Sequence, residues 1–282
     1  MHRSTSEAIL NIVDSTGSCK QSVELFKGIK QLKTDRIFIY SRGFVPIPLL
    51  RPHSSPRCGG SIYWVHKFIE NNILLNTSWV TFDYLDSSHL CDMGQEFDVS
   101  CLSAVIQAVK KLNPQAQLTL VGMCRGAHAI IRYLANTNDS SVDTIILESP
   151  YATGQQLMSA IAQNHVAPYI GNATAQTLCN MLFKLHYPNF DKAQDNLLES
   201  IESISNKKIF IGHGLSDKII MLEDINNLVD RLAISNDVYF HLSDYLPGEG
   251  HGSLTFSPSF GNAVNTFGIQ CSLLSETKLA VA

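Results

Sequence analysis

Residues 118–134 read LTLVGMCRGAHAIIRYL, and this stretch decides the fold of the chain. It begins as a short apolar β run and ends with apolar residues at the three- and four-residue spacing of a helix. Between the two, Cys124 is flanked by Gly122 and Gly126. A reactive side chain on a sharp strand-to-helix turn needs small residues two positions before and after it, because larger ones would collide with the adjoining elements. The pattern predicts such a turn at Cys124, with a buried structural cysteine as the alternative.

The composition is that of a folded protein with a sizeable core. With 282 residues, 45% of them hydrophobic and 16% charged, the chain could form one large α/β domain or two small ones. No internal repeat or linker divides it, so we expect a single domain over residues 1–282. The net charge of −4 and the absence of a run of Lys and Arg argue against a nucleic-acid partner.

The cysteines and the apolar stretches predict whether the protein binds a metal and where in the cell it lies. The 7 Cys are scattered, and no C-x-x-C, HExxH or H-x-x-x-H pattern offers metal ligands, so we expect no metal and no cofactor. We interpret the thiols as mostly buried in a reducing compartment. The N-terminal apolar stretch is too short for a signal peptide, and no apolar run is long enough for a membrane span. We therefore expect a soluble cytoplasmic protein, with non-classical secretion left open and the oligomeric state undetermined.

Apolar runs and helical periodicities alternate along the rest of the chain. Residues 4–34 have a helix-compatible spacing that suggests an amphipathic helix, with an early strand in Ala8–Val13 as the alternative. Further strands are predicted at 36–40, 79–84, 142–147, 207–212 and 238–242, and helices at 61–72, 98–112, 222–232 and after Ser253. This alternation predicts an α/β fold with a mainly parallel central sheet covered by helices on both faces.

Two polar residues on late loops can act together with Cys124. Asp217 leaves the strand predicted at 207–212, and His251 lies between two glycines after the strand predicted at 238–242. A thiol is mostly protonated at neutral pH and needs a base, which His251 can supply. Asp217 can hold the imidazole in the right tautomer and stabilise the imidazolium. The start of the helix after Cys124 favours the thiolate further.

Other acids and histidines compete for these roles. Glu148, after the strand at 142–147, and Glu249, near His251, are alternatives to Asp217 as the acid. Asp217 could also serve only as a turn residue or helix cap, and His251 could be a surface residue. His128 follows Cys124 by one helical turn, so we expect it to pack against a neighbour of the sheet, and we expect His213 to fix a loop.

Together these motifs resemble the α/β-hydrolase superfamily. The resemblance rests on Gly-x-Cys-x-Gly, on Gly-His-Gly-x-x-Asp at 212–217, and on the late histidine loop, in the chain order nucleophile, acid, His. The loop Ser41-Arg42-Gly43-Phe44 matches in part, because Arg42 stands where the superfamily commonly has His. The resemblance implies that the backbone N–H groups of Phe44 and Arg125 form the oxyanion hole. It also implies that residues 154–206, which are helical in pattern, form a small lid; ordinary crossover helices are the alternative.

Cysteine at the nucleophile position narrows the resemblance to a few groups within the superfamily. Members that carry it include dienelactone hydrolases and the cysteine-type acyl-CoA thioesterases and acyltransferases, although a serine replaced by cysteine would give the same sequence. The resemblance implies a hydrolase that cleaves an ester or thioester bond of a small acyl substrate through an acyl-enzyme. Acyl transfer by the same triad and a non-catalytic binding protein with this fold are the alternatives.

Overall fold

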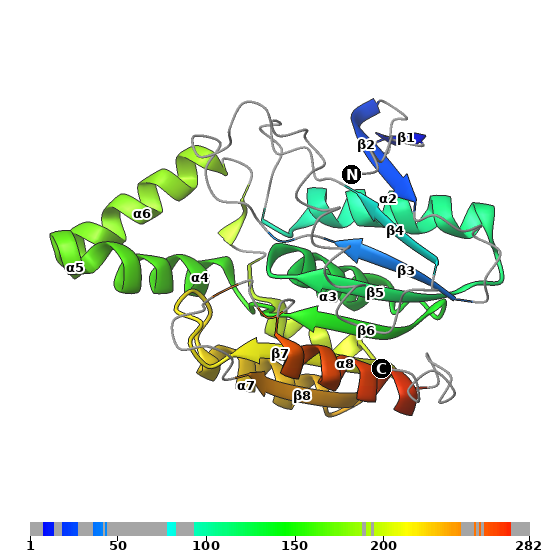
Figure 1. Ribbon diagram of the computed structural model, residues 1–282. Helices are drawn as coiled ribbons and strands as arrows, with labels where there is room; N and C mark the ends of the chain where they lie inside the picture. Colours follow the sequence, from blue (N-terminus) through cyan, green and yellow to red (C-terminus); the bar gives the residue numbers. More distant parts are fainter. Residues whose placement is uncertain are drawn as a thin grey trace.

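A computed structural model of the chain contains a twisted, mostly parallel sheet between layers of helices (Figure 1). It describes residues 8–13, 19–27, 36–41, 43, 78–82, 93–187, 190–192, 195–243, 251, 254 and 257–271. The strands within these ranges are β1 (Ala8–Val13), β2 (Cys19–Lys27), β3 (Arg36–Ser41), β4 (Ser78–Phe82), β5 (Gln117–Met123), β6 (Val142–Glu148), β7 (Lys208–Gly214) and β8 (Asp237–Ser243). Their order is β1-β2-β4-β3-β5-β6-β7-β8. The six strands from β4 to β8 run parallel, and β1 and β2 add an antiparallel edge.

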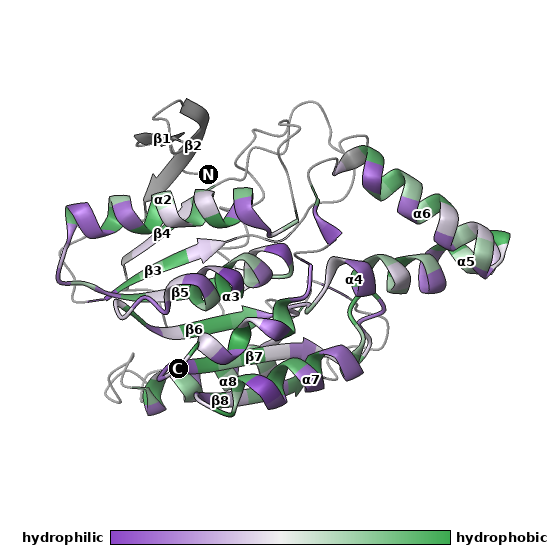
Figure 2. Ribbon diagram, turned by 180° about the vertical axis from the view of Figure 1, so that it is seen from behind, coloured by the Kyte–Doolittle hydropathy of each residue, from purple (hydrophilic) through white to green (hydrophobic). Residues whose placement is uncertain are grey.

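Successive side chains of the parallel strands pack against different helices, because they point to opposite faces of the sheet. Ile37 and Ile39 of β3 face a core shared with α2 (Glu96–Leu112), α3 (Arg125–Thr137) and α7 (Leu222–Leu232). Phe38 and Tyr40 face the other core, which includes residues of α8 (Pro258–Gln270). Figure 2 shows the covering helices alternating between purple and green along their length, as amphipathic helices do. The predicted fold class, with helices on both faces, is confirmed.

The N-terminal helix predicted within residues 4–34 is wrong. Its described residues form β1, which confirms the alternative of an early strand in Ala8–Val13, and β2, which pairs antiparallel with β4, for example Leu25 with Phe82. Val23 and Leu25 fit the two-residue spacing of a strand as well as the spacing of a helix, so pairing with distant residues decides the outcome. The helix predicted at 61–72 lies outside the described residues.

A helical arm leaves the fold after β6, near the carboxyl ends of the parallel strands (Figure 1). It consists of α4 (Gly154–Ile161), the π-helix η2 (Ala162–Val166), α5 (Ala167–Ile170) and α6 (Asn172–His186), and short 3₁₀ turns at Leu197–Glu199 and Ile201–Ser203 lead back to β7. The described part of residues 154–206 is thus helical and contains no strand. One face of α6 packs through Ala175 and Cys179 on α4 and η2. The neighbouring face leaves Met181, Leu182 and Leu185 exposed.

The helices of the described ranges differ from membrane-spanning helices, which need about 20 mostly apolar residues. None of them is long and apolar enough to cross a bilayer.

Candidate active site

Cys124 occupies a sharp turn between β5 and α3. Its backbone angles are φ 49° and ψ −114°, in the positive-φ region that side chains with a Cβ rarely adopt. The turn is held from both sides, because the Cys124 N–H donates to the Glu148 carbonyl at 2.9 Å and the Cys124 carbonyl accepts from the His128 N–H at 2.9 Å. The residue is only 4% exposed and caps the N-terminal, electropositive end of a helix. The local geometry therefore presents the thiol at the start of a helix, on a turn that is fixed from both sides.

Two glycines make room for this turn. A Cβ on Gly122 would lie 2.8 Å from both the Cα and the N of Ala127, which is why the strand can meet the helix only with glycine there. A Cβ on Gly43, just after β3, would lie 3.4 Å from the Cβ of Cys124 and 3.2 Å from the Met123 carbonyl oxygen. Gly43, two residues after the end of β3, thus lies directly beside the cysteine. Phe44, the predicted second oxyanion donor, lies outside the described residues.

His251 and Asp217 meet at the same end of the sheet. The Nδ1 of His251 lies 2.8 Å from Oδ2 of Asp217, and the two side chains are 14% and 1% exposed. The other carboxylate oxygen of Asp217 accepts from the backbone N–H groups of Ile219 at 2.8 Å and Ile220 at 3.0 Å. The hydrogen bond to His251 and the His251 charge outweigh burial and lower the pKa of Asp217. The carboxylate is therefore ionised and fixed in orientation.

The ring of His251 also interacts with Cys124. Burial alone would lower the pKa of His251, but the negative charge of Cys124, hydrogen bonds to Asp217 and Cys124, and the charge of Asp217 raise it well above the usual 6.5. Cys124 and Asp217 thus both lie close to the His251 ring. This environment favours the protonated imidazolium form of His251.

The side chains of the competing residues Glu148 and His128 make other contacts. Glu148 is buried and accepts the Leu254 N–H at 3.1 Å, so it binds the backbone three residues after His251. Glu249 lies outside the described residues. His128 stacks on Tyr151 at 4.4 Å between ring centroids, and its Nδ1 lies 2.9 Å from the Tyr151 carbonyl oxygen. Burial, aided by the charge of Arg132, lowers the pKa of His128 to about 3, so it is neutral.

His213 is a buried neighbour of Asp217. Its Nδ1 lies 3.9 Å from Oδ2 of Asp217, too far for a hydrogen bond. Burial lowers its pKa and outweighs the attraction of Asp217, so His213 is neutral at pH 7. It packs beside the acid, whereas His251 makes the hydrogen bond.

Sequence reasoning did not find a buried ion pair next to the turn. Arg125, the residue after Cys124, binds Asp98 of α2 through two hydrogen bonds of 2.5 Å each. The two side chains are 1% and 0% exposed. An acidic residue in the first turn of a helix is ordinary, so nothing in the sequence distinguished Asp98.

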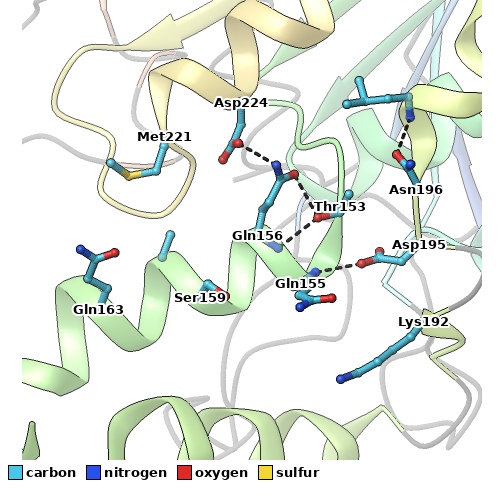
Figure 3. Close-up of a pocket in the computed structure, with 12 residues that line it drawn as sticks. Thr153, Gln155, Gln156, Ser159, Gln163, Lys192, Asp195, Asn196, Met221 and Asp224 are labelled. Atoms are coloured by element: carbon cyan, nitrogen blue, oxygen red, sulfur yellow. Dashed lines mark hydrogen bonds between the residues drawn. The ribbon is translucent and has the colours of Figure 1, made fainter. Parts of the chain in front are cut away.

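A polar cavity of about 610 Å³ lies at the base of the arm, between α4, the segment around residues 192–198 and the start of α7 (Figure 3). Gln156 of α4 spans one side and donates to Asp224 of α7 at 2.8 Å. Asp195 accepts the backbone N–H groups of Gly154 at 2.7 Å and Gln155 at 2.9 Å, and its burial raises the pKa of its carboxyl group. The lining suits a hydrated or hydroxyl-bearing group better than an acyl chain.

Within the described ranges, no group of three His, Cys, Asp or Glu side chains is arranged to hold a metal ion.

The similarity of this chain to known proteins is found in its structure and not in its sequence. No protein-family model and no curated protein sequence matches the chain. Esterase Pf2001 from Pyrococcus furiosus superposes with a TM-score of 0.64 at 16% identity, over 93% of this chain and 91% of that one. XC6422 from Xanthomonas campestris, an α/β serine hydrolase without a lid, gives 0.54 at 13% identity over 94% of both chains. Est1E from Butyrivibrio proteoclasticus gives 0.54 at 13% identity, over 95% of this chain and all of that one. The chain therefore has the α/β-hydrolase fold.

Proposed function

We propose that this protein hydrolyses carboxylic ester or thioester bonds of small acyl substrates, with Cys124 as nucleophile, His251 as base and Asp217 as the orienting acid. The observation that carries the proposal is the contact of His251 with Cys124 on one side and, at 2.8 Å, with Asp217 on the other. The strained turn that presents Cys124 adds support. Esterases and a serine hydrolase among the structural neighbours agree with this class of reaction.

The chemistry follows from these positions. His251 holds the proton of the Cys124 thiol, and the thiolate sulfur attacks the carbonyl carbon, so that the C–S bond forms and the C=O electron pair moves to oxygen. When the intermediate collapses, the bond to the leaving oxygen or sulfur breaks and His251 gives that atom its proton. Water then attacks the acyl-cysteine with His251 as base, which releases the carboxylic acid and restores the thiol. Asp217 keeps Nδ1 of His251 protonated throughout.

The oxyanion would be bound by backbone N–H groups. Arg125 is the first residue of α3, and the first N–H groups of a helix have no acceptor within the helix. Its position beside the attacked carbon suits a donor that meets the developing negative charge. Phe44 is proposed as the second donor because Gly43, the residue before it, lies against Cys124.

The thiol also supports acyl transfer as a second candidate activity. A thioester intermediate is more readily passed to an acceptor other than water than an oxygen ester is, because sulfur is the better leaving group. The arm formed by α4 to α6, within residues 154–206, is proposed as the lid over the acyl site, since it leaves the sheet at the edge where Cys124 lies.

Trapping the intermediate tests the proposal. We expect wild-type protein mixed with p-nitrophenyl acetate to carry one acetyl group on Cys124 in peptide mass spectrometry, and Cys124→Ala to carry none. Cys179→Ala is the matched control, because Cys179 is also a buried free thiol but lies in the arm, where burial raises its pKa. Acetylation that spreads over several cysteines, or absence of turnover with both ester and thioester substrates, would contradict the proposal.

A further inference from the structure

The residue that follows the proposed nucleophile is anchored by a buried charge pair. Nε of Arg125 donates to Oδ2 of Asp98 and Nη2 donates to Oδ1, each at 2.5 Å. A two-point contact of this kind fixes the orientation of the guanidinium as well as its distance. Because both side chains are 1% exposed or less, neither can replace its partner with water.

Asp98 is itself held in place by the backbone just before α2. The backbone N–H of Gly94 donates to Oδ2 of Asp98 at 2.5 Å, and the Met93 carbonyl accepts the Tyr151 hydroxyl at 2.5 Å. Gly94 fits tightly here, since a Cβ on it would lie 2.7 Å from the His128 ring and 3.2 Å from the Arg125 carbonyl oxygen. The segment before α2 is therefore packed directly onto the first turn of α3.

We propose that Asp98 is a positioning residue for oxyanion binding. It holds the Arg125 side chain, and through it the Arg125 backbone N–H, at the place where charge develops on the substrate. The backbone there follows a residue with φ 49°, a conformation that persists only when its surroundings enforce it. The inference rests on the proposed function, because it assigns a task within that reaction.

The inference predicts different effects on two reactions of the Cys124 thiol, acylation by an ester and alkylation by iodoacetamide. Acylation by an ester passes through a tetrahedral oxyanion, so it depends on the Arg125 N–H. Alkylation by iodoacetamide is a displacement in which sulfur bonds to the CH₂ carbon while iodide leaves, and no oxyanion forms. Asp98→Asn leaves the Arg125 charge incompletely paired and loosens the first turn of α3. We expect Asp98→Asn to slow acylation about 10- to 100-fold, less than complete loss of an oxyanion donor. It should leave alkylation within about twofold, because the hydrogen bond between His251 and Asp217 does not involve Asp98.

The chain offers a matched control at the opposite edge of the sheet. Arg36, the first residue of β3, binds Asp143 near the start of β6 through two contacts of 2.5 Å and 2.6 Å. Asp143→Asn breaks the same kind of pair far from the carboxyl ends of the strands. It should leave both reactions of Cys124 within about twofold of wild type.

The experiment measures both rates at pH 7 by stopped-flow release of p-nitrophenol and by mass spectrometry of the alkylated peptide. Arg125→Lys, which keeps the charge and loses the two-point geometry, gives the same test should Asp98→Asn fail to fold. Acylation of the Asp98 or Arg125 variant at the wild-type rate would overturn the inference, and so would an equal loss of acylation and alkylation. Absence of acylation in the wild-type protein would instead overturn the proposed function, and this inference with it.

Discussion

Replacing Asp217 with Asn should prevent His251 from acting as a base without unfolding the protein. In the wild-type protein, Oδ2 of Asp217 faces Nδ1 of His251 at 2.8 Å, and Oδ1 accepts the N–H groups of Ile219 and Ile220. The amide oxygen of Asn can keep the two backbone bonds, so the NH₂ group must face the ring. The imidazole then has to present an unprotonated Nδ1 to that group and carry its proton on the nitrogen that faces Cys124.

The size of the loss follows from this change of tautomer. A ring that carries its proton on the nitrogen facing the thiol cannot accept the thiol proton. The substitution also removes two of the interactions that raise the pKa of His251, namely the hydrogen bond to Asp217 and the charge of Asp217. In hydrolases with this type of triad the same substitution costs about 10⁴-fold in kcat. Because a thiol needs less activation than a hydroxyl, we expect about 10³- to 10⁴-fold here, equivalent to about 4–5.5 kcal/mol.

The assay is ester turnover, paired with unfolding as a function of pH. Glu148→Gln is the control, because Gln keeps an acceptor oxygen for the Leu254 N–H; its activity should stay within about threefold of wild type. The lowered pKa of Asp217 stabilises the fold above the ordinary carboxyl pKa of 3.8, and this advantage over Asp217→Asn should disappear as the pH falls through the lowered value. Near-normal turnover of Asp217→Asn, or a larger loss in Glu148→Gln, would refute the reasoning.

Two further predictions concern stability. The pKa of His128 is lowered from 6.5 to about 3, so the unfolded chain binds a proton that the folded chain rejects; wild type should lose about 2–3 kcal/mol more than His128→Gln between pH 7 and pH 4.5 in urea unfolding. An equal loss in both proteins would show that His128 is not the group responsible. Gly122→Ala places a Cβ 2.8 Å from the Ala127 backbone and should lower the free energy of unfolding by about 1–3 kcal/mol, whereas Gly214→Ala, whose Cβ meets nothing closer than 3.6 Å, should cost under about 1 kcal/mol. Similar values for the two glycine variants would contradict the packing explanation.

The sequence predicted those parts of the fold that local patterns determine. The strand, turn and helix around Cys124 follow from an apolar run, small residues on both sides and a helical periodicity, all within residues 118–134. The end of a parallel strand is also a local feature, which is why Asp217 and His251 could be assigned to one edge of the sheet before their distance was known. Their catalytic roles remain a prediction.

The rest depends on contacts between distant residues. The strand β2 is determined by its pairing with β1 and β4, and its own sequence allows a helix equally well. Asp98 and Arg125 are 27 positions apart, and only the packing of α2 on α3 turns two ordinary surface residue types into a buried pair. No spacing in the chain indicates such a contact.

The positive φ of Cys124 has a consequence for directed evolution. A side chain in this conformation costs about 1–3 kcal/mol, which glycine would recover. A library screened only for resistance to heat or protease would therefore enrich glycine at position 124 and discard the thiol. Improving the durability of this protein requires a screen that rewards turnover in every round.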